Sequence, residues 1–161
     1  MIFHVSMDAR EPQRVAEVLA ELMGGRATPF PPVAQGSWVA HADDDRNTLV
    51  EVYPLGTMLV EAEGDADFLG VPGMRMPSSS HFAMATRLSQ GEVFAIATRE
   101  GWPAKYRKRG GAFGVIELWI EGERVVEVLT DAMQDEYQRA LTLEGWLAML
   151  AHGDAKHRLP A

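Results

Sequence analysis

The sequence predicts an α+β fold made of two tandem βαβββ modules followed by C-terminal helices. The first observation is hydrophobic periodicity: residues 1–54 read as a strand, a helix and three strands, and this order returns over residues 80–130. The second is a histidine early in each copy and a glutamate late in each copy, at matching positions. The third is that residues 131–161 are helical in pattern and have no counterpart in the first copy. Residues 55–79 are then left as a connector between the two modules.

The first module is predicted from periodicity and from helix and turn signals. Residues 2–7 alternate between two faces, as a strand does, and an apolar stripe at helical spacing then predicts a helix that ends at Gly24. The prolines of residues 27–32 suit an edge strand. Residues 36–42 and 48–54 read as two further strands joined by a polar turn.

The second module repeats this order. A strand over residues 81–88 leads into a helix that opens with a capping box at Ser89 and Glu92. An extended and basic segment, residues 102–109, comes next, and two more strands carry the module to Thr130.

The connector and the tail carry weaker signals. Residues 55–79 are rich in glycine, proline and serine, and they read either as a lid over a cleft or as a crossover between the modules. The tail predicts one helix over residues 131–141 and another over residues 144–153. Its apolar stripe is typical of a core face or of a dimer contact.

Composition limits the class of partner and the cellular location. The chain has 161 residues, 15 basic and 23 acidic side chains and a net charge of −8, which argues against nucleic acid or an anionic membrane surface as the main partner. There is no cysteine, no secretory signal and no apolar run long enough to span a bilayer. We therefore expect a cytoplasmic globular protein.

A histidine and a glutamate recur at matching positions in the two halves. His4 on the first strand aligns with His81, and Glu51 on the last strand aligns with Glu127. Because successive side chains of a strand point to opposite faces, the valines beside each glutamate face the helix and the glutamate faces away. The same alternation puts both histidines on the face away from the helices. The prediction is that two histidines and two glutamates converge from two related half-sheets.

Two carboxylates in a half-buried cleft repel each other and are costly to desolvate unless a positive charge lies between them. A divalent cation satisfies both, and two neutral imidazoles complete a mixed nitrogen and oxygen shell. The sequence therefore predicts a metal site at His4, Glu51, His81 and Glu127. Two other interpretations stay open: each residue alone is most often structural or solvated, and a duplicated fold can keep histidine and glutamate as an ion pair.

With these residues, the duplicated order of elements resembles the vicinal oxygen chelate superfamily. The set of two histidines and two glutamates is most similar to that of glyoxalase I and glyoxalase-like members. The resemblance covers residues 1–130 and leaves the helical extension outside. It implies a cupped, mostly antiparallel mixed sheet around one divalent ion per site, which would be Zn, Ni, Mn, Fe or Co, and it implies a homodimer.

The resemblance implies a metal-dependent lyase or isomerase. The ion would chelate adjacent oxygens of a small-molecule substrate and stabilise an enediolate-type intermediate, with Glu127 as the base and Glu51 as the fallback. The presence of Glu51 favours this branch over three-ligand fosfomycin-modifying enzymes and over dioxygenases with two histidines and one glutamate. No set of residues for holding glutathione is evident, so the substrate stays open. The alternative is a metal-free drug- or metabolite-binding protein of the same fold, like the bleomycin resistance proteins.

Three further residues are candidates for substrate binding. His41 aligns with Trp119 on the third strand of each half, and Glu117 lies two residues before Trp119. His41 and Glu117 would line the cavity, or they are strand-end surface residues, which is the more frequent case. Trp119 would form part of an apolar wall for the substrate, although packing in the core is the default for such a residue. The basic residues within 105–109 would clamp a substrate anion, although protection of an edge strand by charge is the favoured interpretation.

Overall fold

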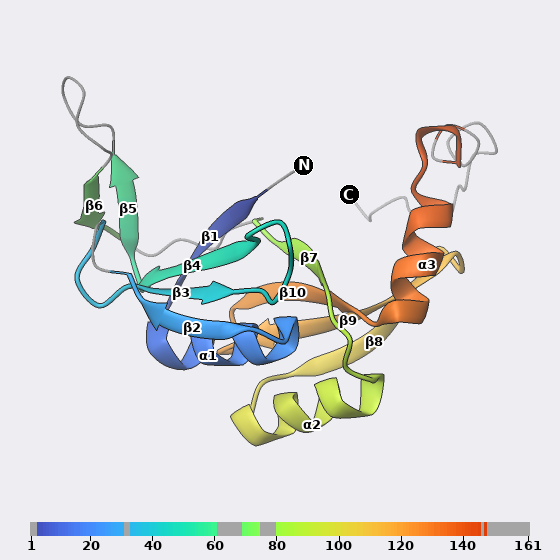
Figure 1. The fold of residues 1–161 in the computed structure, drawn as a ribbon, viewed down its shortest axis with the longest axis horizontal. Helices are drawn as coiled ribbons and strands as arrows, with labels where there is room; N and C mark the ends of the chain where they lie inside the picture. The colour runs from blue at the N-terminus through green and yellow to red at the C-terminus, as the bar shows by residue number, and fades with distance from the viewer. Residues whose placement is uncertain (1–2, 31–32, 61–68, 75–79, 146, 148–161) are drawn as a thin grey trace, which may run out of the picture.

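The computed structural model describes residues 3–30, 33–60, 69–74, 80–145 and 147. The first half contains a helix and four strands, with the bounds β1 His4–Ala9, α1 Pro12–Met23, β2 Arg26–Pro29, β3 Trp38–His41 and β4 Leu49–Pro54. The strands form one sheet in the order β1-β4-β3-β2. β1 is parallel to β4, and the other neighbours are antiparallel. The order of elements predicted for this half is confirmed (Figure 1).

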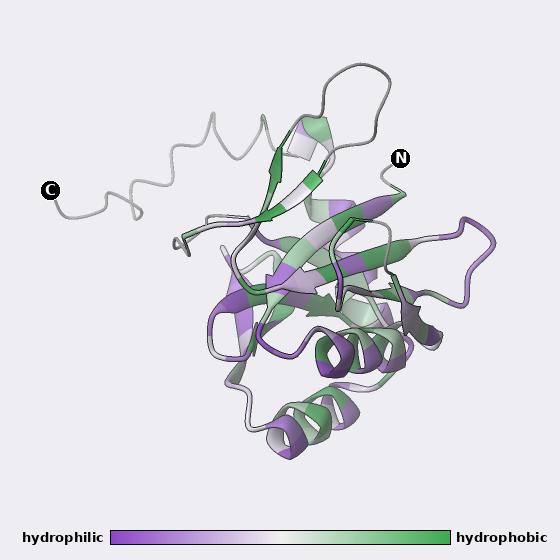
Figure 2. Ribbon diagram, turned by 90° about the vertical axis from the view of Figure 1, so that its left-hand side faces the viewer, coloured by the Kyte–Doolittle hydropathy of each residue, from purple (hydrophilic) through white to green (hydrophobic). Residues whose placement is uncertain are grey.

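The connector contains a hairpin that the sequence analysis did not predict. Its strands are β5 Thr57–Val60 and β6 Leu69–Pro72, which pair antiparallel in a separate two-stranded sheet. The turn between β4 and β5 passes through Gly56, whose φ of 80° favours glycine. The hairpin stands apart from the larger sheets, and much of it is apolar (Figures 1 and 2).

The second half repeats the first. Its bounds are β7 Phe82–Ala85, α2 Gln90–Glu100, β8 Ala104–Arg109, β9 Phe113–Ile120 and β10 Arg124–Leu129. The sheet order is β7-β10-β9-β8, and β7 is parallel to β10. The predicted capping box is present, since Ser89 and Glu92 bond reciprocally at the start of α2.

The hydrogen-bond registers of the two sheets are equivalent. Ser6 lies opposite Glu51 between β1 and β4, and Ala83 lies opposite Glu127 between β7 and β10. Equivalent residues of the two halves are therefore Ser6 and Ala83, Val39 and Glu117, His41 and Trp119, Glu51 and Glu127, and Tyr53 and Leu129. The structural register thus gives the same alignment of the two glutamates as the sequence does.

The two halves share one hydrophobic core. Both helices lie on the same side of the molecule, below the sheets (Figures 1 and 2). Buried residues of α1, α2, β4, β9 and β10 form a single cluster, in which Leu19, Val52, Ile116 and Val126 are fully enclosed. Burial of apolar surface from both halves therefore holds them together.

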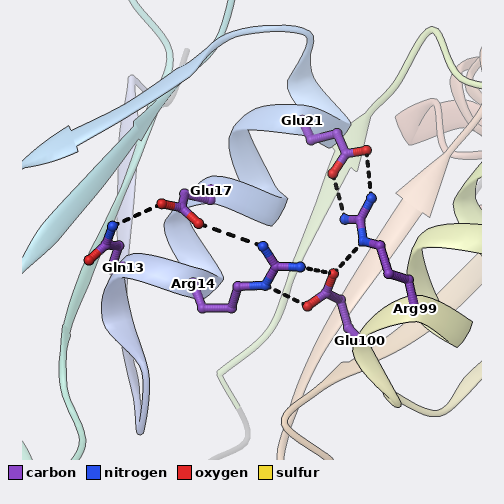
Figure 3. A network of polar contacts seen from close by, with 6 residues as sticks. All are labelled: Gln13, Arg14, Glu17, Glu21, Arg99 and Glu100. Carbon is purple, nitrogen blue, oxygen red and sulfur yellow. Dashed lines mark hydrogen bonds and ion pairs between the residues drawn. The ribbon is translucent and has the colours of Figure 1, made fainter.

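Polar contacts also connect the helices. Arg14 of α1 pairs with Glu100 of α2, and Arg99 of α2 pairs with Glu21 of α1 at 2.6 Å (Figure 3). Glu100 also accepts from Arg99, and its side chain is only 6 % exposed. The arginines are nearly half exposed, so solvent weakens these ion pairs even though the side chain of Glu100 is itself little exposed.

The tail begins with helix α3, Asp131–Ala140, as predicted. Met133 is buried, and Tyr137 packs edge-on against Phe113 of β9 with ring centroids 5.1 Å apart. The second predicted tail helix, over residues 144–153, lies largely outside the described residues. Within the described part of the chain, no helix is long and apolar enough to cross a membrane.

Candidate functional site

A cavity of about 450 Å³ lies where the two halves meet. Its walls are residues of β1, the end of β4, β5 and the starts of β7 and β10. The lining residues that matter below are Ser6, Asp8, Tyr53, Met58, Leu59, His81, Phe82 and Arg124. A cavity of this size suits a small organic molecule.

Asp8 and Arg124 form the charged part of the cavity wall. Arg124 donates from Nε and Nη2 to Asp8 Oδ1, at 2.9 and 2.6 Å, and the Gly56 N–H donates to Oδ2 at 3.0 Å. Burial would raise the pKa of Asp8, but the hydrogen bond from Gly56 and the ion pair with Arg124 outweigh it and hold the pKa below its usual value. The pair joins β1 of one half to β10 of the other and fixes this wall.

Glu51 is held by hydroxyl groups. It is 8 % exposed, and its Oε2 accepts from Ser6 Oγ at 2.8 Å and from Tyr53 Oη at 2.7 Å. Burial, with the hydrogen bond to Glu51, raises the pKa of Tyr53 well above its usual value. Both donors lie on the same strand face as Glu51, so the alternation of β1 and β4 places them there.

Glu127 is held by a cation. Arg109 Nη2 lies 2.6 Å from Glu127 Oε1 and 2.8 Å from Glu117 Oε1, so one guanidinium bridges the two carboxylates. Arg107 Nε lies 3.3 Å from the other oxygen of Glu117. The ion pair with Glu127 raises the pKa of Arg109. Equivalent glutamates in the two halves are thus stabilised by different chemistry.

His4 and His81 occupy equivalent, exposed positions at or just before the first strand of each half. His81 lines the cavity. Each half therefore carries one histidine and one glutamate on adjacent parallel strands. Among the residues that the structure describes, no three histidines or carboxylates lie close enough to hold a metal ion. The donors suit a divalent ion chemically, but one chain does not bring a full set together.

The three substrate-binding candidates are not among the residues that line the cavity. His41 ends β3, and its Nε2 lies 3.1 Å from Thr28 Oγ1. Trp119 is 38 % exposed, and Glu117 is occupied by Arg107 and Arg109. The sequence predicted no role for Ser6, Asp8 or Arg124 and no pairing of Arg109 with Glu127. Strand alternation gave a signal for Ser6 and Asp8, whereas the arginine contacts depend on tertiary structure.

Together these features define a duplicated βαβββ protein with a small-molecule cavity between its halves, and the chain has the fold of the vicinal oxygen chelate superfamily, as predicted. The glyoxalase I of Leishmania major, described as trypanothione-dependent, is similar in structure with a TM-score of 0.52 and 14 % identity, over 95 % of this chain and 99 % of that chain. A lactoylglutathione lyase from Agrobacterium tumefaciens has a TM-score of 0.49 and 11 % identity, over 80 % and 91 % of the two chains. The fosfomycin resistance protein FosX of Mesorhizobium loti has a TM-score of 0.47 and 14 % identity, over 86 % and 98 %.

The fold assignment rests on the first of these structures. No protein-family model matches the sequence, and no curated protein sequence matches it. At these identities the likeness concerns the fold, so the activity has to be argued from this chain's own residues.

Proposed function

We propose that the protein is a metal-dependent lyase or isomerase acting on a small molecule with adjacent oxygen atoms, and that two chains complete each metal site. The observation that carries this proposal is the equivalent register of the two sheets, which gives each half one histidine and one glutamate in matching places. A single chain has no group of three such ligands among its described residues. A homodimer that sets the first half of one chain against the second half of the other would supply four.

The chain's own residues would divide the chemistry. A divalent ion in such a site supplies a Lewis acid for two adjacent oxygens of the substrate. Glu127 would accept the proton from the carbon beside the polarised carbonyl, because its cationic partner Arg109 is 43 % exposed and free to move towards solvent. Glu51, fixed by Ser6 and Tyr53, would stay in place. The cavity beside His81 would hold the part of the substrate that does not react, since Glu51 and Glu127 are not among its lining residues.

Complementation between half-sites tests this proposal, where a half-site is the histidine and the glutamate that one half of the chain supplies. One double variant, His4→Ala with Glu51→Gln, removes the first half-site, and another, His81→Ala with Glu127→Gln, removes the second. Each variant alone should contain little metal after purification without chelator. Mixed dimers, isolated by two different affinity tags, should regain about one ion per dimer because one intact site is restored.

The controls separate the parts of the proposal. Circular dichroism must show that both variants fold, and light scattering must show that they are dimers. Mixed dimers without metal would rule out a site shared between chains. A wild-type dimer that takes up no Zn²⁺, Ni²⁺ or Mn²⁺ would rule out the metal-dependent activity.

A second candidate function is metal-free binding of a small, largely apolar molecule. This function is favoured because both carboxylates already have partners. Glu51 accepts hydrogen bonds from two hydroxyl groups, and Glu127 forms an ion pair with Arg109. The cavity wall also carries apolar side chains, among them Leu59 and Phe82. If this function is right, apolar compounds should raise the melting temperature in the presence of EDTA, and Leu59→Asp should abolish the effect.

A further inference from the structure

We propose that Arg109 is a displaceable internal cation, which occupies the carboxylate pair Glu117–Glu127 in the unliganded chain and competes there with a divalent metal ion. This inference rests on the proposed function, since it concerns the second half-site. It assigns Arg109 the role of setting metal affinity, and it assigns Glu117 to the electrostatics of the site.

The first step is the geometry of the carboxylate pair. Glu117 and Glu127 lie directly opposite each other on the antiparallel strands β9 and β10. Their side chains are 15 % and 13 % exposed, so solvent screens their repulsion only partly. Like charges at opposite positions of a sheet destabilise it. A cation is therefore required between them, and Arg109 Nη2 reaches both, at 2.8 and 2.6 Å.

The second step is the comparison with the first half. The residue equivalent to Glu117 is Val39, so Glu51 faces no second carboxylate. Glu51 needs only the hydroxyls of Ser6 and Tyr53, and the equivalents of these donors in the second half are Ala83 and Leu129. The fold itself therefore requires no arginine at such a glutamate. The second half instead places two carboxylates together, and Arg109 bridges them while Arg107 contacts only Glu117.

The third step is that Arg109 is free to leave. It is the last residue of the edge strand β8 and is followed by Gly110 and Gly111, which both have positive φ, 54° and 74°. Its side chain is 43 % exposed, so it reaches solvent without disturbing the core. The exposed guanidinium weakens its ion pairs with the two carboxylates, whereas coordination of a divalent ion by deprotonated carboxylates is strong. A metal ion can therefore displace Arg109, and the cost of displacement lowers the apparent affinity.

Removal of the arginine charge tests the inference. In Arg109→Gln we expect Zn²⁺ or Ni²⁺, measured by competition with a metal-binding dye, to bind on the order of tenfold more tightly. The metal-free variant should melt at a lower temperature than wild type, because Glu127 loses Arg109 and Glu117 keeps only Arg107. Arg109→Lys keeps the charge, so its metal affinity and its melting temperature should lie between those of wild type and Arg109→Gln. If Arg109→Gln does not fold, Arg109→Gln with Glu117→Gln removes the repulsion, and its metal affinity should return towards that of wild type.

The matched control is Lys105→Gln. Lys105 is on the same strand face of β8, opposite Glu117 in register, and it has no ion pair among the described residues. Its removal deletes the same charge without breaking the bridge, so metal affinity should change less than twofold.

The outcomes distinguish this inference from the proposed function. If wild type binds metal and Arg109→Gln binds it no more tightly, the inference is wrong and the proposed function stands. If only Arg109→Gln binds metal, the inference stands and a metal-dependent activity of the natural chain is wrong. If neither protein binds metal, both are wrong.

Discussion

Replacement of Tyr53 by phenylalanine removes one hydroxyl group from the interior of the first half-sheet and preserves the ring. The Oη atom lies 2.7 Å from Glu51 Oε2, and the two residues are 3 % and 8 % exposed. A hydrogen bond to a charged group contributes about 1.5–3 kcal/mol, and the carboxylate keeps only Ser6 when Tyr53 is changed. We therefore expect the free energy of unfolding to fall by about 2 kcal/mol, and the melting temperature by roughly 4–8 °C for a chain of this length.

The pH dependence of this loss follows from the raised pKa of Tyr53. Burial and the hydrogen bond to Glu51 favour the neutral phenol in the folded state. The contribution is fully present below the pKa of an unfolded tyrosine, about 10, and it is lost as the pH rises above that value. The difference between wild type and Tyr53→Phe should therefore be constant at neutral pH and shrink above about pH 10.

Urea unfolding followed by tryptophan fluorescence, at pH 7 and at pH 10.5, measures both effects. The matched control is Tyr137→Phe, because that ring packs on Phe113 and its hydroxyl has no hydrogen bond among the described residues. We expect the control to change stability by less than about 0.5 kcal/mol. The reasoning is refuted if Tyr53→Phe is as stable as wild type, or if both variants lose the same stability.

Three further substitutions test the contacts between the two halves and the packing within the first half. Asp8→Asn should lower the free energy of unfolding by about 1–3 kcal/mol at pH 7. Because the pKa of Asp8 is lowered in the fold, this difference should begin to shrink as the pH falls below about 4 and disappear only below the lowered pKa, which urea titrations across pH would reveal. Gly25→Ala should cost at least about 2 kcal/mol, because a Cβ there would lie 1.8 Å from the carbonyl oxygen of His41; Gly91→Ala, where the nearest atom is 4.0 Å away, should be neutral or stabilising in the same melts. Glu100→Gln should cost about 1–2 kcal/mol at low salt and less at 1 M salt, and an equal cost at both salt concentrations would contradict an ionic origin.

Much of the fold could be predicted because its signals are local. The alternation of residues 2–7 and the capping box at Ser89 and Glu92 depend only on neighbouring residues. The structure has the strand β1 over His4–Ala9 and the start of helix α2 after Ser89. The hairpin β5–β6 was missed because Gly56 and the neighbouring glycines and prolines resembled a loop. The glycine instead provides the turn, and the short apolar strands pair only with each other.

By itself, the sequence determined the duplicated βαβββ order and the equivalence of Glu51 and Glu127, because periodicity and repetition are properties of the chain. The two-residue alternation of strands also put Tyr53 on the face of Glu51. Only the tertiary structure decided what holds each carboxylate. Arg109 reaches Glu127 from a different strand, and Arg124 reaches Asp8 from the other half. Such contacts form where the long side chains of arginines reach across to another strand. The spacing of residues along the chain does not encode which strands pack next to one another.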